Sequence, residues 1–179
     1  TWMPAYLMRH YGADPSTVGL QYGAQVLIIG AIGIYSGPWM ERWLIRRGYP
    51  DSPVRCAMLC ALVVLLGCIA FAFTTSYGSA LVVAAVINLF YALPQAVAAS
   101  ALQIATPNRM RGLAVSIYYF LISVFGLGVA PSIIALVTDH VLKNPAGVGL
   151  SLAIVCSVSS LGAFWLLYGA MKHYRKTLD

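Results

Sequence analysis

Five long apolar runs dominate the sequence, and each is long enough to cross a membrane. They cover residues 17–39, 56–75, 80–105, 113–137 and 148–171, and none contains Asp, Glu, Lys or Arg. A helix needs about 20 mostly apolar residues to span about 30 Å of hydrocarbon. Turn-forming pairs such as Asp14-Pro15 and Asn144-Pro145 lie between the runs. The pattern predicts an all-α, polytopic membrane helix bundle with five spanning helices.

The two ends of the chain add shorter segments to this pattern. Residues 1–12 are apolar but too short to span a bilayer, and we predict that they end a helix that begins upstream. Residues 172–179 carry three Lys or Arg side chains after the last run and are predicted to form a polar tail. The whole chain, 1–179, is therefore expected to be a single membrane domain.

Basic residues are distributed unequally between the two sides of these runs. With five crossings, one side receives nine Lys or Arg residues and the other side receives two. The nine are Arg42, Arg46, Arg47, Arg55, Arg109, Arg111, Lys172, Arg175 and Lys176, and the two are Arg9 and Lys143. Loops rich in Lys and Arg remain in the cytoplasm. We therefore expect an integral protein of a bacterial inner membrane, with its C-terminus in the cytoplasm.

The composition agrees with this interpretation and excludes other classes. Of the 179 residues, 60% are hydrophobic and 9% are charged, against roughly 45–50% and about 25% in soluble domains. The formal net charge of +6 is divided among short islands, so the lipid bilayer rather than nucleic acid is the expected partner. The four cysteines lie inside apolar runs, where we expect packing residues and neither metal ligands nor redox groups.

The first run has a glycine face and a glutamine face. At 100° per residue, four glycines fall within roughly 40° of one line; they are Gly19, Gly23, Gly30 and Gly37. Such a stripe predicts close packing against another helix. Gln21 and Gln25 lie on the other side, where an amide facing lipid is unfavourable. These two amides are expected either to line a polar cavity or to hydrogen-bond a neighbouring helix.

The third run contains the best candidate for a solute-facing surface. Asn88, Tyr91 and Gln95 are spaced i, i+3, i+7 and fall within about 60° of one another on a helix. Asn88 lies near the expected midplane, and Pro94 frees a backbone carbonyl one turn earlier. The pattern favours a cavity lining, and the alternative is a hydrogen-bond network between helices worth about 0.6 kcal/mol per contact.

The fourth run repeats this polar spacing and then becomes rich in small residues. Ser116, Tyr119 and Ser123 follow the same i, i+3, i+7 pattern and are expected to face the bundle interior, unless the serine hydroxyls bond to carbonyls of their own helix. The glycines at 126 and 128 precede a proline at 131, which predicts a close helix crossing and a bend there. The residues concerned are Gly126, Gly128 and Pro131.

We find no catalytic constellation in the sequence. The three histidines lie at the predicted interfaces or in the tail, and HExxH, GxSxG and phosphate-loop motifs are absent. No Asp, Glu or His lies in the middle of a run, where proton-coupled pumps usually carry one. We therefore expect neither an enzyme nor a protein with a cofactor or a metal.

Four motifs resemble the C-terminal half of a major facilitator superfamily transporter. The run GPWMER at 37–42, followed by RRG at 46–48, is similar to the cytoplasmic loop signature G-x-x-x-D-R-x-x-x-R-R of that family. TPNRMRG at 106–112 is similar to its P-x-x-x-R-G entry to the eleventh helix, and GLGVAP at 126–131, followed by Asp139, resembles the G-x-G-x-G-P…D stretch of that helix. The run WMPAYLMRHYG at 2–12 resembles the outer end of the seventh helix.

The resemblance extends over essentially the whole chain, with two departures. Glu41 replaces the usual Asp of the loop signature, and Ala130 replaces a Gly before Pro131. Within the superfamily the chain looks most like the Spinster-like or general bacterial permease branches. The resemblance implies twelve helices in two six-helix halves, so that the N-terminal half of the same protein would be a partner of this chain.

The resemblance also implies roles for the loop residues. Glu41 would act as a conformational latch against a helix of the other half. The residues that match the loop and helix-entry motifs are Gly37, Glu41, Arg42, Arg46, Arg47 and Arg111. Arg42, Arg46 and Arg47 could equally act only as determinants of topology.

The sequence thus favours a secondary active transporter fragment that moves a small organic solute by alternating access. The neutral amides, hydroxyls and phenols of the cavity candidates suit sugars, amphiphiles or aromatic solutes. The alternative is a non-transport membrane scaffold or sensor built on the same bundle, in which those polar residues would pair with each other and leave no cavity. On its own, one half is expected not to transport, because it cannot form an alternating gate.

Overall fold

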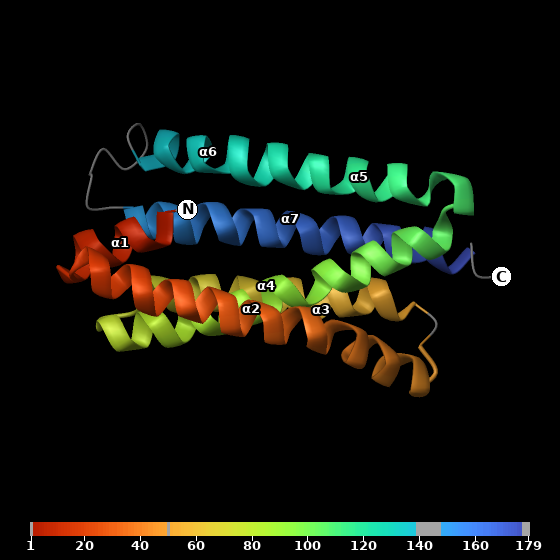
Figure 1. Cartoon of the computed structure of the whole chain (residues 1–179), viewed down its shortest axis with the longest axis horizontal. Helices are drawn as coiled ribbons and strands as arrows, with labels where there is room; N and C mark the ends of the chain where they lie inside the picture. The colour runs from red at the N-terminus through yellow and green to blue at the C-terminus, as the bar shows by residue number, and fades with distance from the viewer. Residues whose placement is uncertain (1, 50, 139–147, 177–179) are drawn as a thin grey trace.

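The chain folds into long helices that lie roughly side by side in one bundle (Figure 1). The computed structural model describes residues 2–49, 51–138 and 148–176, and these contain no strand. The elements are α1 (Trp2–Tyr11), α2 (Pro15–Arg46), α3 (Ser52–Ala72), α4 (Tyr77–Ala105), η1 (Asn108–Met110), α5 (Arg111–Ile122), the π-helical segment η2 (Ser123–Val129), α6 (Ala130–Leu136) and α7 (Val148–Lys176). The predicted all-α fold is confirmed.

Five helical stretches of the described chain are long and apolar enough to cross a membrane. They are Pro15–Arg46, Ser52–Ala72, Tyr77–Gln103, Asn108–Leu136 and Ser151–Gly169. Each exceeds the roughly 17 residues that the shortest spanning helices need. Their side chains are apolar on the outside as well, and Leu166 on α7 is 77% exposed. Such a surface is stable in hydrocarbon, because lipid and not water then covers it.

Local capping explains where two of these helices begin. The Asp14 carboxylate accepts hydrogen bonds from the backbone N–H groups of Ser16 and Thr17 at 3.1 and 3.3 Å, and Pro15 occupies the first helical position of α2. At the start of α4, Ser76 and Ser79 cap each other reciprocally. These side chains satisfy N–H groups that a helix end otherwise leaves without a partner.

The bundle has a basic end. In Figure 1 the end of α2, the beginning of α3, the connection from α4 to α5 and the end of α7 all lie at the right of the view. Arg46 ends α2, Arg55 lies in the first turn of α3, and Arg109 lies in η1. The separate arginine islands of the sequence therefore meet on one side of the bundle.

Two small clusters of buried side chains form the core. One contains Tyr6 and Leu7 of α1 together with buried residues of the helices that they contact, namely Val18, Phe71 and Ala80. The other lies nearer the basic end and contains Leu44, Cys56, Cys60, Leu93 and Val97. Cys56 and Cys60 are therefore packed among apolar side chains in the described structure.

Close packing of α2 against α4 depends on two glycines. A Cβ at Gly33 would lie 2.7 Å from the carbonyl oxygen of Leu89 and 2.8 Å from the Cβ of Ala92, and a Cβ at Gly37 would collide with the carbonyl oxygen of Leu93. Only hydrogen leaves room for the α4 backbone at these two positions.

Within the described residues, the predicted four-glycine stripe makes a close helix contact only at Gly37. Nothing in the described structure lies within 4 Å of a Cβ built at Gly19, Gly23 or Gly30. Gly33, which the sequence analysis left out, is the second packing glycine. Gly33 and Gly37 are four residues apart, so they lie on one face of α2, and this is the face that α4 covers.

The small residues before Pro131 also differ from the expected arrangement. Gly126 and Gly128 lie in η2, and nothing in the described chain lies within 4 Å of a Cβ built at either. The predicted close crossing is thus absent from the described part of the chain. The helix instead changes to π-helical hydrogen bonding just before Pro131, because proline supplies no N–H to the ordinary ladder.

Candidate functional site

A groove of about 410 Å³ lies between α2 and α4. From α4 it receives Asn88, Tyr91 and Gln95, the three residues that the sequence places on one helix face, together with Ala92. From α2 it receives Val26, Leu27, Gly30, Ala31 and Ile34. The structure thus brings the predicted polar stripe of the third run to a real hollow, opposite an apolar wall.

Tight packing of one part of the α2–α4 contact and open space in another part create this groove. Gly33, within the lining segment of α2, and Gly37, one turn further along, hold the two backbones together. Gly30 lines the groove itself and has no neighbour within 4 Å of a built Cβ. The absence of a side chain at Gly30 therefore leaves volume that a larger residue would fill.

Two amide groups beside this helix pair have no hydrogen-bond partner in the described structure. They are the buried Nε2 of Gln25 on α2 and the buried Nδ2 of Asn88 on α4. An unsatisfied buried polar group costs about 1–3 kcal/mol. Native structures rarely keep such groups without water, an ion or a ligand as partner. Asn88 combines this orphan donor with a place in the groove lining.

The groove lining carries no carboxylate, lysine, arginine or histidine. Its polar groups are two amides and one phenol, and the remaining lining side chains are apolar or absent. Such a surface offers hydrogen-bond donors and acceptors of fixed position without a net charge. Within the described residues, no group of three or more His, Cys, Asp or Glu side chains could hold a metal ion.

The structure places the other predicted cavity residues elsewhere. The Gln21 Oε1 accepts a hydrogen bond from the hydroxyl of Tyr77 at 2.8 Å, which joins the beginnings of α2 and α4. This is the helix-to-helix alternative that the sequence left open for a glutamine. Gln25 does not line the groove but contributes the orphan amide nitrogen next to the same helix pair.

The polar line of α5 is exposed in the described chain and lies outside the groove. The hydroxyl of Ser116 donates to the carbonyl of Gly112 at 2.8 Å, the bond within its own helix that the sequence analysis gave as the alternative. Tyr119 packs edge-on against Tyr118 with ring centroids 5.3 Å apart. Ser123 is exposed at the beginning of η2.

The apolar half of the groove was missed by the sequence analysis. Val26, Leu27, Ala31 and Ile34 look like ordinary residues of a membrane helix. The small pair Gly30-Ala31 could have indicated this wall. Once α2 and α4 are known to be neighbours, the pair lies at the same depth as the polar stripe. That neighbour relation is tertiary information, and no single helix contains it.

Comparison with known proteins shows the family to which the chain belongs. The family described as Major Facilitator Superfamily matches residues 1–178 of the chain. The chain belongs to the Major Facilitator Superfamily. Members of this family are generally membrane transporters, and the apolar helices of this chain are those of an integral membrane protein.

A curated relative agrees with this membership in the superfamily. The chain is 35% identical over 54 residues to "Uncharacterized transporter YybO" of Bacillus subtilis (strain 168). The match covers 30% of this chain and 12% of the relative. No solved structure matches the chain.

The loop motif of the superfamily lies at the basic end of α2. Glu41 is half-buried, and no ion pair involving it occurs in the described structure. The Nε of Arg42 donates to the carbonyl of Pro38 at 3.1 Å, and the guanidinium of Arg47 stacks on the Trp43 ring at 3.8 Å. Arg42 and Arg47 are therefore held by their own helix, whereas the Glu41 carboxylate makes no salt bridge in the described residues and interacts only at longer range with Arg42.

The remaining motif residues lie at helix ends. Arg46 is exposed in the last turn of α2. Arg111 begins α5, and its Nε donates to the carbonyl of Thr106 at 3.2 Å across the connection from α4. The Asp139 that completes the predicted helix motif lies outside the described residues, as do His140 and Lys143.

Proposed function

We propose that this chain forms the C-terminal half of a secondary active transporter, which moves a small organic solute by alternating access. The groove between α2 and α4 is one wall of the solute path. The observation that carries the proposal is the position of Asn88, Tyr91 and Gln95 together in a hollow of about 410 Å³ in a membrane bundle. Transporters bind their solutes near the midplane, between rigid halves that rock against each other.

The alternative function, a scaffold or sensor without transport, requires these polar residues to satisfy one another. In the described structure none of the three donates a side-chain hydrogen bond to another, and the Asn88 amide nitrogen has no partner. Polar groups inside a membrane that are not paired in the fold generally face a water-filled path or a substrate. The open groove therefore favours transport.

The lining favours an uncharged or amphiphilic solute. The amides of Asn88 and Gln95 and the phenol of Tyr91 would hydrogen-bond hydroxyl or carbonyl groups, while Leu27 and Ile34 would cover an apolar part. A dianion is disfavoured, since the lining contains no Arg or Lys to neutralise it.

The second wall and the latch would come from an N-terminal half. The carboxylate of Glu41 suits the positive end of a helix in that half, which agrees with its lack of a salt bridge among the described residues. The basic end of the bundle would face the cytoplasm. Within the superfamily, we propose the Spinster-like or the general bacterial permease branch.

Accessibility to water tests the solute path without knowledge of the solute. In a variant of the full-length protein whose native cysteines are replaced by alanine, Asn88→Cys and Gln95→Cys should react with a charged, membrane-impermeant methanethiosulfonate. The reagent attacks thiolates, which form only in contact with water. Leu166→Cys is the matched control, because Leu166 is 77% exposed on an apolar helix face and should be covered by lipid.

Equal labelling at the groove positions and at position 166 would show that the groove is not a water-filled path. Once a transported solute is found, Asn88→Leu, Tyr91→Phe and Gln95→Leu should raise its KM. Gln103→Leu is the control for loss of an amide, since Gln103 lies on α4 but outside the groove lining. An unchanged KM in all three groove variants, with normal expression, would overturn the assignment.

A further inference from the structure

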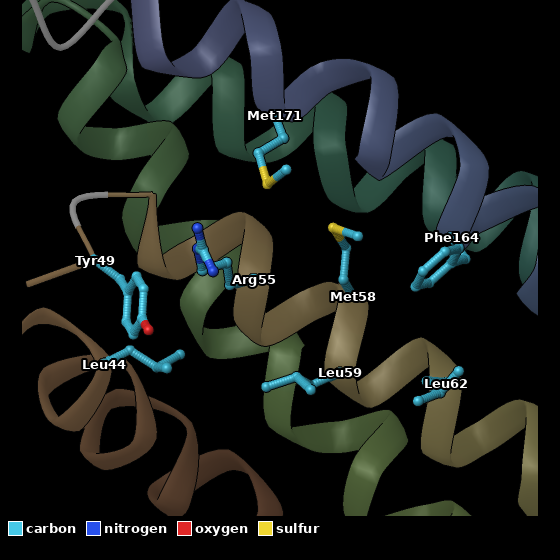
Figure 2. A pocket seen from close by; sticks show the side chains of 8 residues that line it. All are labelled: Leu44, Tyr49, Arg55, Met58, Leu59, Leu62, Phe164 and Met171. Atoms are coloured by element: carbon cyan, nitrogen blue, oxygen red, sulfur yellow. The ribbon is translucent and has the colours of Figure 1, made fainter. Parts of the chain in front are cut away.

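A second groove, of about 300 Å³, lies at the basic end of the bundle (Figure 2). It is bounded by the end of α2, the first half of α3 and the second half of α7, and it is separate from the hollow between α2 and α4. The lining residues are Leu44, Tyr49, Arg55, Met58, Leu59, Leu62, Phe164 and Met171.

Arg55 supplies the positive charge of this groove in a fixed position. Its Nε donates to the Oδ1 of Asp51 at 2.8 Å, and its guanidinium lies 4.3 Å from the centre of the Tyr49 ring. Asp51 is 1% exposed and is not among the lining residues. Arg55 and Tyr49 therefore line the groove, whereas Asp51 is buried and outside the lining.

The rest of the groove is a hydrocarbon surface. Figure 2 shows Met58 of α3 and Met171 of α7 pointing toward each other across the gap, with Phe164 further along α7 and Leu62 further along α3. Leu59 and Leu62 are exposed although they line the groove. Methionine side chains adapt their shape to flexible apolar partners, so this surface suits a chain of methylene groups.

The basic part and the apolar part of the groove follow each other in the same order as the phosphate and the acyl chains of a phospholipid. The charged group lies near the beginning of α3, at the end of the bundle where Arg46 ends α2, and the apolar side chains continue from there toward the membrane interior along α3. Arginine matches phosphate oxygens with parallel hydrogen bonds. Basic pockets between membrane helices on the cytoplasmic side are suited to anionic head groups.

We infer that this groove binds one anionic phospholipid, with its phosphate on Arg55 and one acyl chain along Met58, Leu62 and Phe164. The lipid would fill the gap between α3 and α7 and fix the position of the two helices relative to each other. The inference needs only a chain inserted in a membrane and does not depend on the solute path.

Competition between two lipids tests the inference. The full-length protein is purified with an equimolar mixture of phosphatidylglycerol and phosphatidylcholine, and the bound lipids are counted by native mass spectrometry. We expect wild-type protein to retain phosphatidylglycerol preferentially and Arg55→Gln to lose about fivefold of that preference, the value of one arginine beside an anionic head group. The matched control Arg109→Gln removes an exposed arginine outside the groove and should retain it.

A second pair of variants tests the apolar part. Leu62→Trp should fill the groove and reduce retention of both lipids, whereas Leu66→Trp, at an exposed position one turn along α3 and outside the lining, should not. If Arg55→Gln unfolds because the Asp51 carboxylate loses this ion pair, Asp51→Asn with Arg55→Gln removes the uncompensated buried charge and should give the same loss of preference.

Three results would overturn the inference. These are equal retention of both lipids by wild-type protein, equal losses in Arg55→Gln and Arg109→Gln, and full retention in Leu62→Trp. Dissociation of a dimer by Leu62→Trp in the absence of lipid would also contradict lipid binding, because it would assign the groove to a second copy of the chain.

Discussion

The contact between α2 and α4 depends on two positions that have no room for a methyl group. We expect Gly33→Ala to be strongly destabilising because its Cβ would lie 2.7 Å from the Leu89 carbonyl oxygen and 2.8 Å from the Cβ of Ala92. Backbone cannot rotate away as the end of a side chain can, so the two helices must separate. At Gly67 the nearest atom, 2.7 Å away, belongs to the side chain of Ile87, and Gly67→Ala should cost less.

The size of the effect follows from the kinds of atoms that meet. Overpacking a close contact costs about 1–3 kcal/mol. A Gly-to-Ala change at an uncrowded helix position has the opposite sign, because it gains about 0.5–1 kcal/mol of helix propensity. Gly23→Ala is the matched control, since nothing in the described structure lies within 4 Å of its built Cβ. Both variants gain the same helix propensity, so their stabilities should differ by the cost of the clash alone.

Thermal unfolding of the purified protein in detergent measures this difference. A change of 1 kcal/mol moves the midpoint by roughly 2–4 °C for a chain of this size. Gly33→Ala should lower the midpoint by several degrees, whereas Gly23→Ala should leave it unchanged or raise it. Equal midpoints in the two variants would refute the close α2–α4 contact and with it the shape of the groove.

Three other predictions test local interactions. The buried hydroxyls of Thr138 and Ser151 are hydrogen-bonded at 2.8 Å, so a double-mutant cycle of Thr138→Val and Ser151→Ala should give a coupling of about 0.6 kcal/mol, and at most ~1.7. Hydrogen bonds from the Ser16 hydroxyl and from the backbone of Thr17 and Ser16 hold the pKa of Asp14 below its usual value; the stability lost in Asp14→Ala should therefore be full at neutral pH and fade as the pH falls below ~4. Asn88→Leu should raise the thermal midpoint while it impairs transport, because it removes an unsatisfied buried amide.

The fold could be predicted because its main determinant is local. A run such as 56–75 without a charge must be helical in lipid, since its backbone groups have no other partner. The breaks between runs contain Pro, Gly or Asp residues that cap or end helices, as Asp14 and Pro15 do for α2. Both signals can be seen in a window of about 20 residues.

The choice of helix face could not be predicted in the same way. The line through Gly19, Gly23, Gly30 and Gly37 fits the helical period, yet the structure uses Gly33 and Gly37. Period and residue size show which residues share a face, but the face that is covered depends on the neighbouring helix. The position of α4 against α2 decides that, and it results from packing over the whole bundle.

The candidate site could be predicted in part from the sequence. The spacing of Asn88, Tyr91 and Gln95 was sufficient to place them on one face of α4, and all three line the groove. Amides and phenols that share a helix face inside a membrane are costly unless they face protein or water, so the composition of the face restricts its surroundings. The apolar wall from α2 carries no such cost and gave no comparable signal.

The amides without a hydrogen-bond partner connect the fold to its function, because their contribution to the stability of the bundle is unfavourable. A side chain kept only for packing would be replaced without loss by leucine, which fills similar space and has no unpaired donor. Asn88 is half-buried and lines a groove that has room for a ligand, and its buried Nδ2 lies near the Tyr22 side chain without forming a hydrogen bond of good geometry. Its contribution to stability in the described bundle is thus unfavourable, and a bound solute or water that accepts from it would reverse that sign. Opposite effects of Asn88→Leu on stability and on transport would therefore distinguish a binding residue from a structural one.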